Sequence, residues 1–322
     1  MRAVLVRENG GPEVLEYTEI DTPVVSPGQL LVDVAAAGVN YIDTYQREGR
    51  YPVRTPFVLG IEGAGTVREV GEGVVDVEVG DRVAWKESLG SYAEQVLVEA
   101  EDAVPVPDAV SDELAAAVLL QGLTAHYLAT STYAVQQGDW VVVHAAAGGV
   151  GLLLTQIVKI RGGNVLATTS TPEKAALAER AGADETTSYE GFAERARELT
   201  AGDGVVCVYD GVGKATFDAS LDALRPRGMM ALFGAASGPV PPVDPQLLNA
   251  KGSLFLTRPT LKHYTLTREE LLARTDELMG WIAAGELDVH IGDKRPLSEA
   301  RGAHEDLEGR RTTGKLLLLP PS

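Results

Sequence analysis

Residues 139–161, DWVVVHAAAGGVGLLLTQIVKIR, decide the fold of this chain. The apolar run at 140–143 lacks polar alternation, as expected of a strand covered by helices on both faces of a parallel sheet. From Val150 onward the apolar residues recur at helical spacing, so the period changes from strand to helix across a glycine turn. A strand, a glycine turn and a helix in this order predict a nucleotide-binding unit.

The turn at 146–151 fits G-x-G-x-x-G with alanine in place of the first glycine. Gly148 would let the backbone approach a pyrophosphate, and Gly151 would let the helix pack closely on the strand. The N–H groups and the positive dipole end of the helix would bind the phosphates. No Lys-Ser or Lys-Thr pair follows the last glycine, which argues against a P-loop. An ordinary tight turn is the alternative.

Length and composition limit the function classes. A chain of 322 residues is long for one core, so we expect two domains. The formal charge of −18 opposes binding to nucleic acids and to anionic membranes. We find no run of 18 apolar residues and no signal peptide, and expect a cytoplasmic protein. The single cysteine, Cys207, excludes an internal disulfide and reads as a buried apolar residue.

Strands and helices alternate between residue 139 and about residue 257. We expect strands at 140–143, 164–168, 185–189, 205–209, 228–233 and 253–257, with helices from 150 and at 172–181, 191–200 and 214–224. Six strands with crossover helices predict an α/β fold with a doubly wound parallel sheet. Its ligand would lie beyond the carboxyl ends of the strands.

The flanking segments have a different pattern. Residues 1–105 are rich in alternating strands and glycine bends, including a strand-like stretch at 74–80, and predict a small barrel. Two helices, at 111–120 and 125–133, would connect the domains. After Pro259 we expect a helix at 267–284 and strands at 287–291 and 315–319. This tail is too short for a core of its own and should return to the first domain.

The end of the second expected strand bears on the choice of nucleotide. An NAD-selective site would place an acidic residue there, whereas this chain has Ser170 and Thr171 followed by Lys174. Hydroxyls and a lysine suit the 2′-phosphate of NADPH. The alternative is a helix cap with a solvated lysine. The turns that begin at Asp210 and Phe233 could line the cofactor, although Asp210 could instead cap the next helix.

Several motifs occur together along almost the whole chain. The motifs are GGPEVL at 10–15, GVNYIDTY at 38–45, GDRV at 80–83, GLTA at 122–125, HAAAGGVG at 144–151 and TRP at 257–259. With these motifs the chain resembles the zinc-free quinone oxidoreductases of the medium-chain dehydrogenase/reductase superfamily, the zeta-crystallin group. The resemblance implies a GroES-like catalytic barrel at 1–122 and 263–322, a Rossmann domain at 123–262, and a cleft between them. It also implies NADPH as cofactor and a homodimer or homotetramer.

The resemblance also assigns site residues. The residues near the nicotinamide would be Asn40, Asp43 and Thr124, and Gly149 and Val150 would join Gly148 and Gly151 at the pyrophosphate. The 2′-phosphate would be surrounded by Ser170, Lys174 and Tyr189. The cofactor would be flanked by Phe233, Gly234 and Ser237, and the cleft would be completed by Arg258 and Arg310. Two positions depart from the pattern. Ser170 stands where close relatives often have glycine, and Ala235-Ala236 is less polar than usual.

Zinc alcohol dehydrogenases of the same superfamily need a Gly-His-Glu segment and an early cysteine. This chain has Ile61 before Glu62 and no cysteine before Cys207, so we expect no metal. Without a Lewis acid alcohol oxidation is disfavoured, and a quinone is the better acceptor. We expect Tyr45 and Tyr51 to stack on the quinone, the alternative being half-buried barrel aromatics.

Within that reading, Asn40 and Asp43 would orient the nicotinamide or nearby tyrosines, and solvent would supply protons. His144 reads as a packed residue. Two other functions stay open. One is an NADPH-dependent enone or 2-enoyl thioester reductase, which would use the same hydride geometry. The other is a non-catalytic NADPH-binding protein, for which the acidic charge disfavours RNA as a partner.

Overall fold

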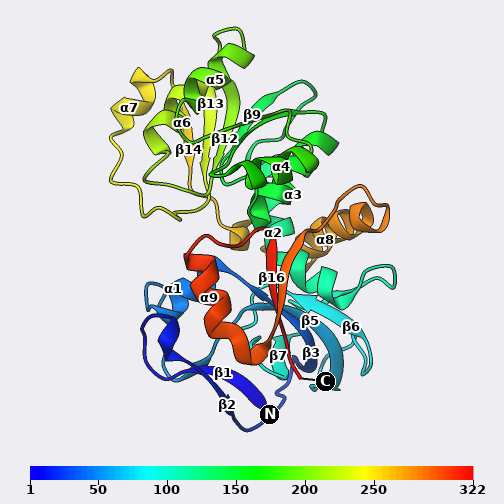
Figure 1. Cartoon of the computed structure of the whole chain (residues 1–322). Coiled ribbons are helices and arrows are strands. Elements are labelled where there is room, and N and C mark those ends of the chain that lie inside the picture. The colour runs from blue at the N-terminus through cyan, green and yellow to red at the C-terminus, as the bar shows by residue number, and fades with distance from the viewer. Residues whose placement is uncertain (322) are drawn as a thin grey trace. The chain divides into compact units, whose positions relative to one another are not determined.

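The computed structural model describes residues 1–321 and separates into two compact units (Figure 1). Each unit is named here after the domain that the resemblance leads us to expect. The catalytic unit comprises Met1–Leu120, Thr275–Ala283 and residues 289–321, and the nucleotide unit comprises Gln121–Arg274 and Ala284–Asp288. The boundaries expected from the resemblance, at residues 122 and 262, stay a prediction.

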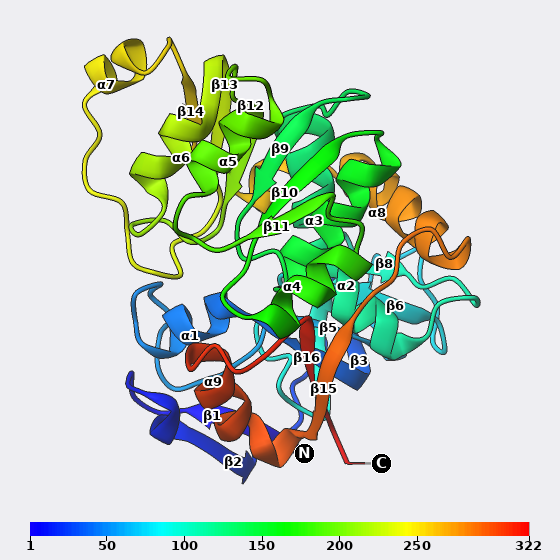
Figure 2. The same ribbon diagram turned by 45° about the horizontal axis from the view of Figure 1, so that its top comes forward.

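The nucleotide unit contains a six-stranded sheet in which every neighbouring pair is parallel. The order is β11-β10-β9-β12-β13-β14, and the strands are β9 Trp140–Val143, β10 Asn164–Thr168, β11 Glu185–Thr187, β12 Val205–Asp210, β13 Leu224–Leu232 and β14 Phe255–Thr257. The chain reverses its direction across the sheet between β9 and β12. The predicted doubly wound parallel sheet is therefore confirmed, and Figure 2 shows its strands side by side.

Helices follow the strands as the sequence predicts, with one addition. They are α3 Gly149–Ile160, α4 Pro172–Arg180, α5 Phe192–Leu199, α6 Phe217–Ala223 and α7 Pro245–Ala250. We did not predict α7, although its start is marked by Asp244, which accepts the Gln246 N–H, and by proline at the first position.

The two faces of this sheet explain its unbroken apolar strands. On one face, Val142 and Val208 belong to a core with residues of α5 and α6. Val141 and Val143 alternate with them, point to the other face and are also fully buried. Both faces are covered, as a parallel sheet with crossover helices requires.

The catalytic unit contains two sheets joined by one core. A small sheet has the order β2-β1-β4, and a larger one has the order β15-β16-β3-β5-β6-β8, with β7 pairing β3. The strands are β1 Arg2–Val6, β2 Leu15–Glu19, β3 Gln29–Val39, β4 Phe57–Val58, β5 Glu62–Val70, β6 Arg82–Trp85, β7 Gln95–Glu99, β8 Val104–Pro105, β15 Ile291–Pro296 and β16 Lys315–Leu319. Residues 74–80 form no strand, so that expectation was wrong.

The C-terminal tail returns to this unit as predicted. β16 pairs antiparallel with β3, placing Leu317 opposite Gly38. The preceding strand begins at Ile291 rather than at 287, and α9 Ala300–Glu308, which we did not predict, lies between the two. The long helix α8 runs over Arg268–Ala283, close to the expected range.

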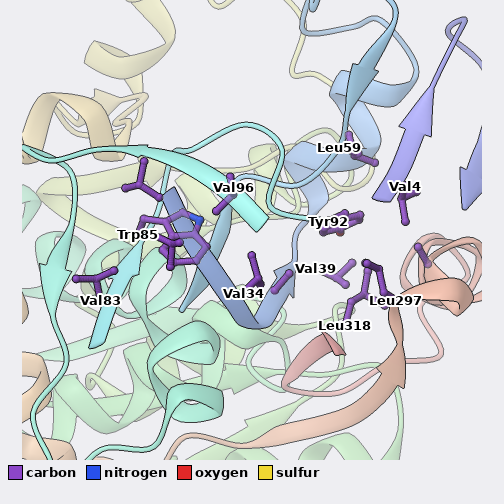
Figure 3. Packing of buried hydrophobic residues seen from close by; sticks show 14 of the residues in the cluster. Val4, Val34, Val39, Leu59, Val83, Trp85, Tyr92, Val96, Leu297 and Leu318 are labelled. Carbon is purple, nitrogen blue, oxygen red and sulfur yellow. The ribbon is translucent and has the colours of Figure 1, made fainter. Parts of the chain in front are cut away.

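Buried side chains from distant segments form the core of the catalytic unit. Figure 3 shows Val4, Val34, Trp85, Tyr92 and Leu318 gathered in it. Trp85 and Tyr92 are fully buried, and each has its polar atom hydrogen-bonded, to Ser91 and to Asp43 respectively. Burying these aromatic rings without leaving a polar atom unpaired fixes the loop at 86–94 against the barrel.

Residues 112–132 form one continuous helical stretch instead of the two helices predicted. α2 Asp112–Tyr127 passes through Gly122 without a break and continues as a π-helical turn, η2 Leu128–Thr132. Among residues 1–321 this is the stretch long and apolar enough to cross a membrane, but 67% of its most apolar window is buried inside the structure. A core helix passes the same test, so the stretch is weak support for a membrane segment.

Candidate functional site

The glycine turn leads directly from β9 into α3. Gly148 is the N-cap and offers no side chain, and the first turn of the helix holds no acidic residue. The first N–H groups of a helix have no partner within it. The turn therefore presents backbone donors and a positive dipole end without a competing carboxylate, which is a donor set that fits a diphosphate.

Gly151 has the packing role predicted for the last glycine of the motif. A Cβ at this position would overlap the Ala145 carbonyl oxygen and would lie 2.7 Å from the Ala146 Cα. Both are backbone atoms and cannot move aside as a flexible side chain can. Any side chain at 151 must push α3 away from the turn.

The end of β10 shows the cap geometry together with the residues expected at the 2′-phosphate. Thr171 is the N-cap of α4, and its hydroxyl accepts the Lys174 N–H at 3.3 Å. Ser170 and Thr171 are exposed, and Lys174 is partly exposed. No acidic side chain occurs between β10 and Thr171, so no carboxylate stands at the end of the strand. The cap reading is correct for Thr171, and the phosphate reading of Ser170 and Lys174 stays a prediction.

Behind this edge, a buried polar network surrounds His144. The imidazole contacts the Thr168 hydroxyl at 2.8 Å through Nδ1 and the Ser220 hydroxyl at 2.9 Å through Nε2. Burial lowers the pKa of His144 to about 4, so the ring is neutral at pH 7. Its ring stacks on that of Tyr189, with centroids 6.1 Å apart. His144 is thus a packed residue, as expected, and supports a predicted cofactor residue.

The turns after β12 and β13 are held by side chains expected to meet the cofactor. Asp210 is buried and accepts the N–H groups of Val212 and Gly213, at 2.7 and 2.9 Å. Ser237 accepts the Ala215 N–H and donates to the Val212 carbonyl. Asp210 therefore fixes its own turn. It does not cap the next helix, because the N-cap of α6 is Thr216, so that alternative was wrong. Ser237 joins the two turns.

The other predicted residues of the nucleotide unit lie on or beside these turns. A Cβ at Gly234 would lie 2.5 Å from the Gly211 carbonyl oxygen, so the two turns touch at glycine. The exposed Arg258 donates to the carbonyl of Phe233 at 2.8 Å. Thr124 is partly buried in α2.

In the catalytic unit, Asn40 and Asp43 lie at the start of α1 Tyr41–Arg47, a helix that we did not predict. The Asn40 N–H donates to Asp43 Oδ2 at 2.8 Å, as does the Tyr92 hydroxyl. Asp43 is fully buried and its Oδ1 has no hydrogen-bond partner. Burial raises the pKa of Asp43 to about 7, against the lowering effect of these two hydrogen bonds.

The Asp43 carboxyl is one end of a buried chain of hydrogen bonds. Tyr92 contacts His304 Nε2 at 3.3 Å, and Arg47 donates to His304 Nδ1 at 3.0 Å. An arginine only donates, so Nδ1 must accept and Nε2 must carry the proton of the neutral ring. Burial and the charge of Arg47 lower the pKa of His304 to about 3. Arg47 is itself paired with Glu308 at 2.7 Å.

A second buried cluster adjoins Asn40. Lys315 Nζ donates to Glu62 Oε2 at 2.5 Å and to Asn40 Oδ1 at 2.8 Å. Asn40 Nδ2 donates to the same Glu62 oxygen at 3.0 Å. Burial lowers the pKa of Lys315, and the Glu62 carboxylate opposes this shift. The side chains of Lys315 and Glu62 are only 3% and 0% exposed.

The predicted quinone-binding aromatics form a small ring cluster. Tyr45 and Tyr51 meet edge to face with centroids 5.6 Å apart, and Tyr51 is 47% exposed. The guanidinium of Arg50 lies 5.5 Å from the Tyr45 ring centroid. Arg310 follows α9 with φ of 56°, an uncommon backbone conformation for a residue with a side chain. Tyr45 and Tyr51 are adjacent and solvent-accessible, whereas Asn40 and Asp43 are buried.

Comparison with known proteins identifies the family. Residues 26–108 match the alcohol dehydrogenase GroES-like domain, and residues 149–283 match the zinc-binding dehydrogenase family. The chain is 47% identical over 315 residues to the quinone oxidoreductase of Pseudomonas aeruginosa, covering 97% of each protein. The chain belongs to the quinone oxidoreductase family of the medium-chain dehydrogenases/reductases.

Two further members of this superfamily are informative. A mycobacterial protein solved in complex with NADPH is 52% identical and superposes with a TM-score of 0.97, covering 99% of this chain and 100% of that one. A 2-haloacrylate reductase from a Burkholderia species is 41% identical over 99% of this chain and 98% of the relative. The GroES-like and Rossmann folds expected from the resemblance are therefore confirmed.

The zinc-binding dehydrogenase family name does not fit the residues of this quinone oxidoreductase family member. Within residues 1–321, no group of three or more His, Cys, Asp or Glu side chains could hold a metal ion. Glu62 belongs to the segment that carries zinc ligands in the alcohol dehydrogenases. In this chain its carboxylate forms an ion pair with Lys315.

Sequence reasoning missed five residues of the two buried clusters. They are Arg47, Tyr92, His304 and Lys315, for which no role was assigned, and Glu62, which was read only as a sign of absent zinc. The one available signal was a lysine opening the apolar run at 315–319. A charged residue at the start of a buried strand requires a partner, but the pattern does not identify it.

Proposed function

We propose that the chain is an NADPH-dependent quinone reductase that works without zinc. Similarity over the full length to a quinone oxidoreductase and to an NADPH-bound protein carries this proposal. The donor set of the α3 turn supports phosphate binding, since the first turn of the helix contains no acidic residue. The end of β10 favours the 2′-phosphate because it has hydroxyls and Lys174 in place of a carboxylate.

In this proposal the catalytic unit orients the reactants. Bound NADPH supplies the hydride. Asn40 and Asp43 hold the nicotinamide end in place, and Tyr45 and Tyr51 provide an aromatic surface for a planar acceptor. Solvent supplies the one proton that, with the hydride, completes the hydroquinone. Orientation and exclusion of water, rather than an ionised side chain, lower the barrier.

Steady-state assays test the function. NADPH oxidation would be followed with 1,4-naphthoquinone, 9,10-phenanthrenequinone, crotonyl-CoA and a 2-haloacrylate as acceptors. We expect turnover with the two quinones. Turnover with crotonyl-CoA or the haloacrylate alone would contradict the proposal.

A second function has a specific observation in its favour. The 41% identical relative is a 2-haloacrylate reductase, whose name denotes reduction of a conjugated double bond. An enone or 2-enoyl thioester reductase would use the same nicotinamide geometry, so only the acceptor pocket separates the two. The same set of acceptors decides between them.

Lys174→Ala tests the choice of cofactor. Loss of a charge-assisted contact to the 2′-phosphate should weaken NADPH binding by roughly 10-fold or more, because such bonds contribute about 1.5–3 kcal/mol. NADH has no 2′-phosphate, so its dissociation constant should change less than about twofold. Fluorescence titration with both nucleotides measures the two constants. Equal losses would refute the assignment, and Lys262→Ala, a lysine outside the predicted site, provides the control.

We also propose a homodimer or homotetramer located in the cytoplasm. β14 ends the parallel sheet and pairs there with β13, and its Phe255 is 57% exposed. An apolar edge strand is a ready surface for a second copy. Phe255→Lys should halve the mass found by light scattering, from dimer to monomer or from tetramer to dimer. An unchanged mass would exclude this edge as the interface.

A further inference from the structure

Three polar side chains form a closed triangle inside the catalytic unit. Asn40, Glu62 and Lys315 contact one another at 2.8, 3.0 and 2.5 Å, and each is at most 3% exposed. They come from three different segments: the start of α1, the start of β5 and the start of β16. Segments far apart in the sequence thus place three hydrogen-bonding groups at one point.

The triangle fixes which way the Asn40 amide points. Its oxygen faces the Lys315 ammonium, which only donates. Its nitrogen donates to the Glu62 carboxylate and, at 3.1 Å, to the Gly38 carbonyl, and both of these only accept. Turning the amide over would place its N–H groups against the ammonium and its oxygen against the carboxylate. Two attractive contacts would become two repulsive ones, so a single orientation is selected.

The surrounding backbone is shaped to admit the pair. Glu62 Oε1 accepts the Leu120 N–H at 2.6 Å, and Gly38 lies opposite Glu62 in the β3–β5 pairing. A Cβ at Gly38 would lie 2.5 Å from Glu62 Oε2 and 2.7 Å from the Lys315 Cε. Glycine at this position is what allows the two charged side chains to lie against β3.

Stability alone does not explain this arrangement. A buried ion pair often contributes less than apolar side chains of the same volume, because both charges lose their hydration. The ion pair instead fixes the position of the Asn40 side chain, with which both of its members form hydrogen bonds. The backbone N–H of Asn40 is held separately by Asp43, so side chain and backbone are fixed by different partners.

We infer that Glu62 and Lys315 are positioning residues that hold the Asn40 amide in one orientation for hydride transfer. The inference rests on the proposed function, in which Asn40 belongs to the nicotinamide end. The pair acts through Asn40 and touches neither reactant. Asn40 Oδ1, which has two lone pairs, accepts from Lys315 with one of them.

The test compares four proteins: wild type, Asn40→Ala, the paired variant Glu62→Gln/Lys315→Met, and the triple variant. The paired variant removes both charges at similar volume, so no lone buried charge is left to unfold the protein. Lys294→Met is the matched control, since Lys294 lies on the adjacent strand β15 and forms an exposed pair with Glu113.

The first readout needs no cofactor and no turnover. The chain has four asparagines, at 9, 40, 164 and 249, so selective ¹⁵N labelling of their side-chain amides gives few signals, and Asn40→Ala identifies the one from Asn40. We expect this signal to be protected from hydrogen exchange in the wild type and in Lys294→Met, and to lose protection at least about 10-fold in the paired variant. Unchanged protection would overturn the inference, whatever the enzyme reduces.

The second readout is the rate constant of hydride transfer in a single turnover, followed by NADPH absorbance. We expect hydride transfer in Asn40→Ala and in the paired variant to be slower than in the wild type by about 10- to 100-fold each. The triple variant should be no slower than Asn40→Ala, because all three variants lose the same feature, the fixed orientation of the Asn40 amide. Independent, multiplying losses would assign the pair a separate role and overturn the inference. Hydride transfer at the wild-type rate in the paired variant, together with slow transfer in Asn40→Ala, would also overturn the inference. The quinone reductase function would be unaffected by that result.

The two readouts separate the inference from the function on which it rests. If the wild type does not oxidise NADPH with a quinone, the proposed function fails, and the exchange measurement still decides whether the pair orients Asn40. If Asn40→Ala transfers hydride at wild-type speed, Asn40 has no part in the reaction and the inference fails alone. A primary isotope effect with 4-deuterated NADPH confirms that hydride transfer is the step being measured.

Discussion

Gly151→Ala should abolish tight binding of NADPH and destabilise the nucleotide unit. The new methyl group would overlap the Ala145 carbonyl and approach the Ala146 Cα, so α3 must move away from the turn. Overpacking of this kind costs about 1–3 kcal/mol of unfolding free energy. Displacing the helix N-terminus also breaks hydrogen bonds to a charged diphosphate, and losing two of them would weaken binding by at least about 100-fold. Urea unfolding and fluorescence titration measure the two effects.

The chain offers a matched control for this change. Gly280 is an exposed residue of α8, and a Cβ there would meet no atom within 4 Å. Gly280→Ala should therefore raise the unfolding free energy by about 0.5–1 kcal/mol, because alanine is the better helix former. It should leave NADPH binding unchanged. Normal binding by Gly151→Ala would contradict the assignment of this turn to the diphosphate.

The second large effect is a dependence of stability on pH that originates at Asp43. Its pKa is raised by burial from 3.8 to about 7, so between these values the folded protein binds a proton that the unfolded chain does not. The wild type must therefore lose stability as pH rises through this window, by about 1.4 kcal/mol per pH unit and about 4 kcal/mol in total. Asp43→Asn removes this contribution, since an amide does not titrate.

The measurement is the difference in unfolding free energy between Asp43→Asn and the wild type at pH 5, 6, 7 and 8. We expect the unfolding free energy of Asp43→Asn to rise relative to that of the wild type up to about pH 7, and the difference between the two to stay constant above that pH. His144 and His304 have pKa values lowered by burial, so each contributes stability that is lost as pH falls below about 6.5, but they are present in both proteins and cancel.

Asp21→Asn, on an exposed side chain, is the control, and its difference should not change with pH. A difference for Asp43→Asn that is equally constant would mean that this carboxyl stays ionised inside the fold.

The nucleotide unit could be predicted from the sequence because its signals are local. The apolar run at 140–143 and the glycines after it determine strand, turn and helix within 23 residues, and parallel sheets require covered strands. The glycine packing at Gly151 followed from the motif alone. Errors were confined to weak signals, such as Gly122, which lies inside a continuous helix because packing outweighs its low helix propensity.

The two buried clusters of the catalytic unit could not be predicted in this way. Asn40 and Lys315 are 275 residues apart, and the distance between Arg47 and His304 is 257 residues. Their contacts depend on the pairing of β16 with β3 and on the position of α9, neither of which a local pattern determines. The sequence indicated that Asn40 and Asp43 matter only through the resemblance, and it did not indicate what holds them.

The direction of the hydrogen bonds that end at Asp43 limits how protons reach the interior. Arg47 keeps its protons at any ordinary pH and donates to His304. His304 must therefore donate to Tyr92, and Tyr92 must donate to Asp43. A Grotthuss wire needs an outer member that can release a proton and then be refilled from water, and a guanidinium does neither. This row is therefore an insulator: it cannot carry protons between bulk water and the acid at its inner end.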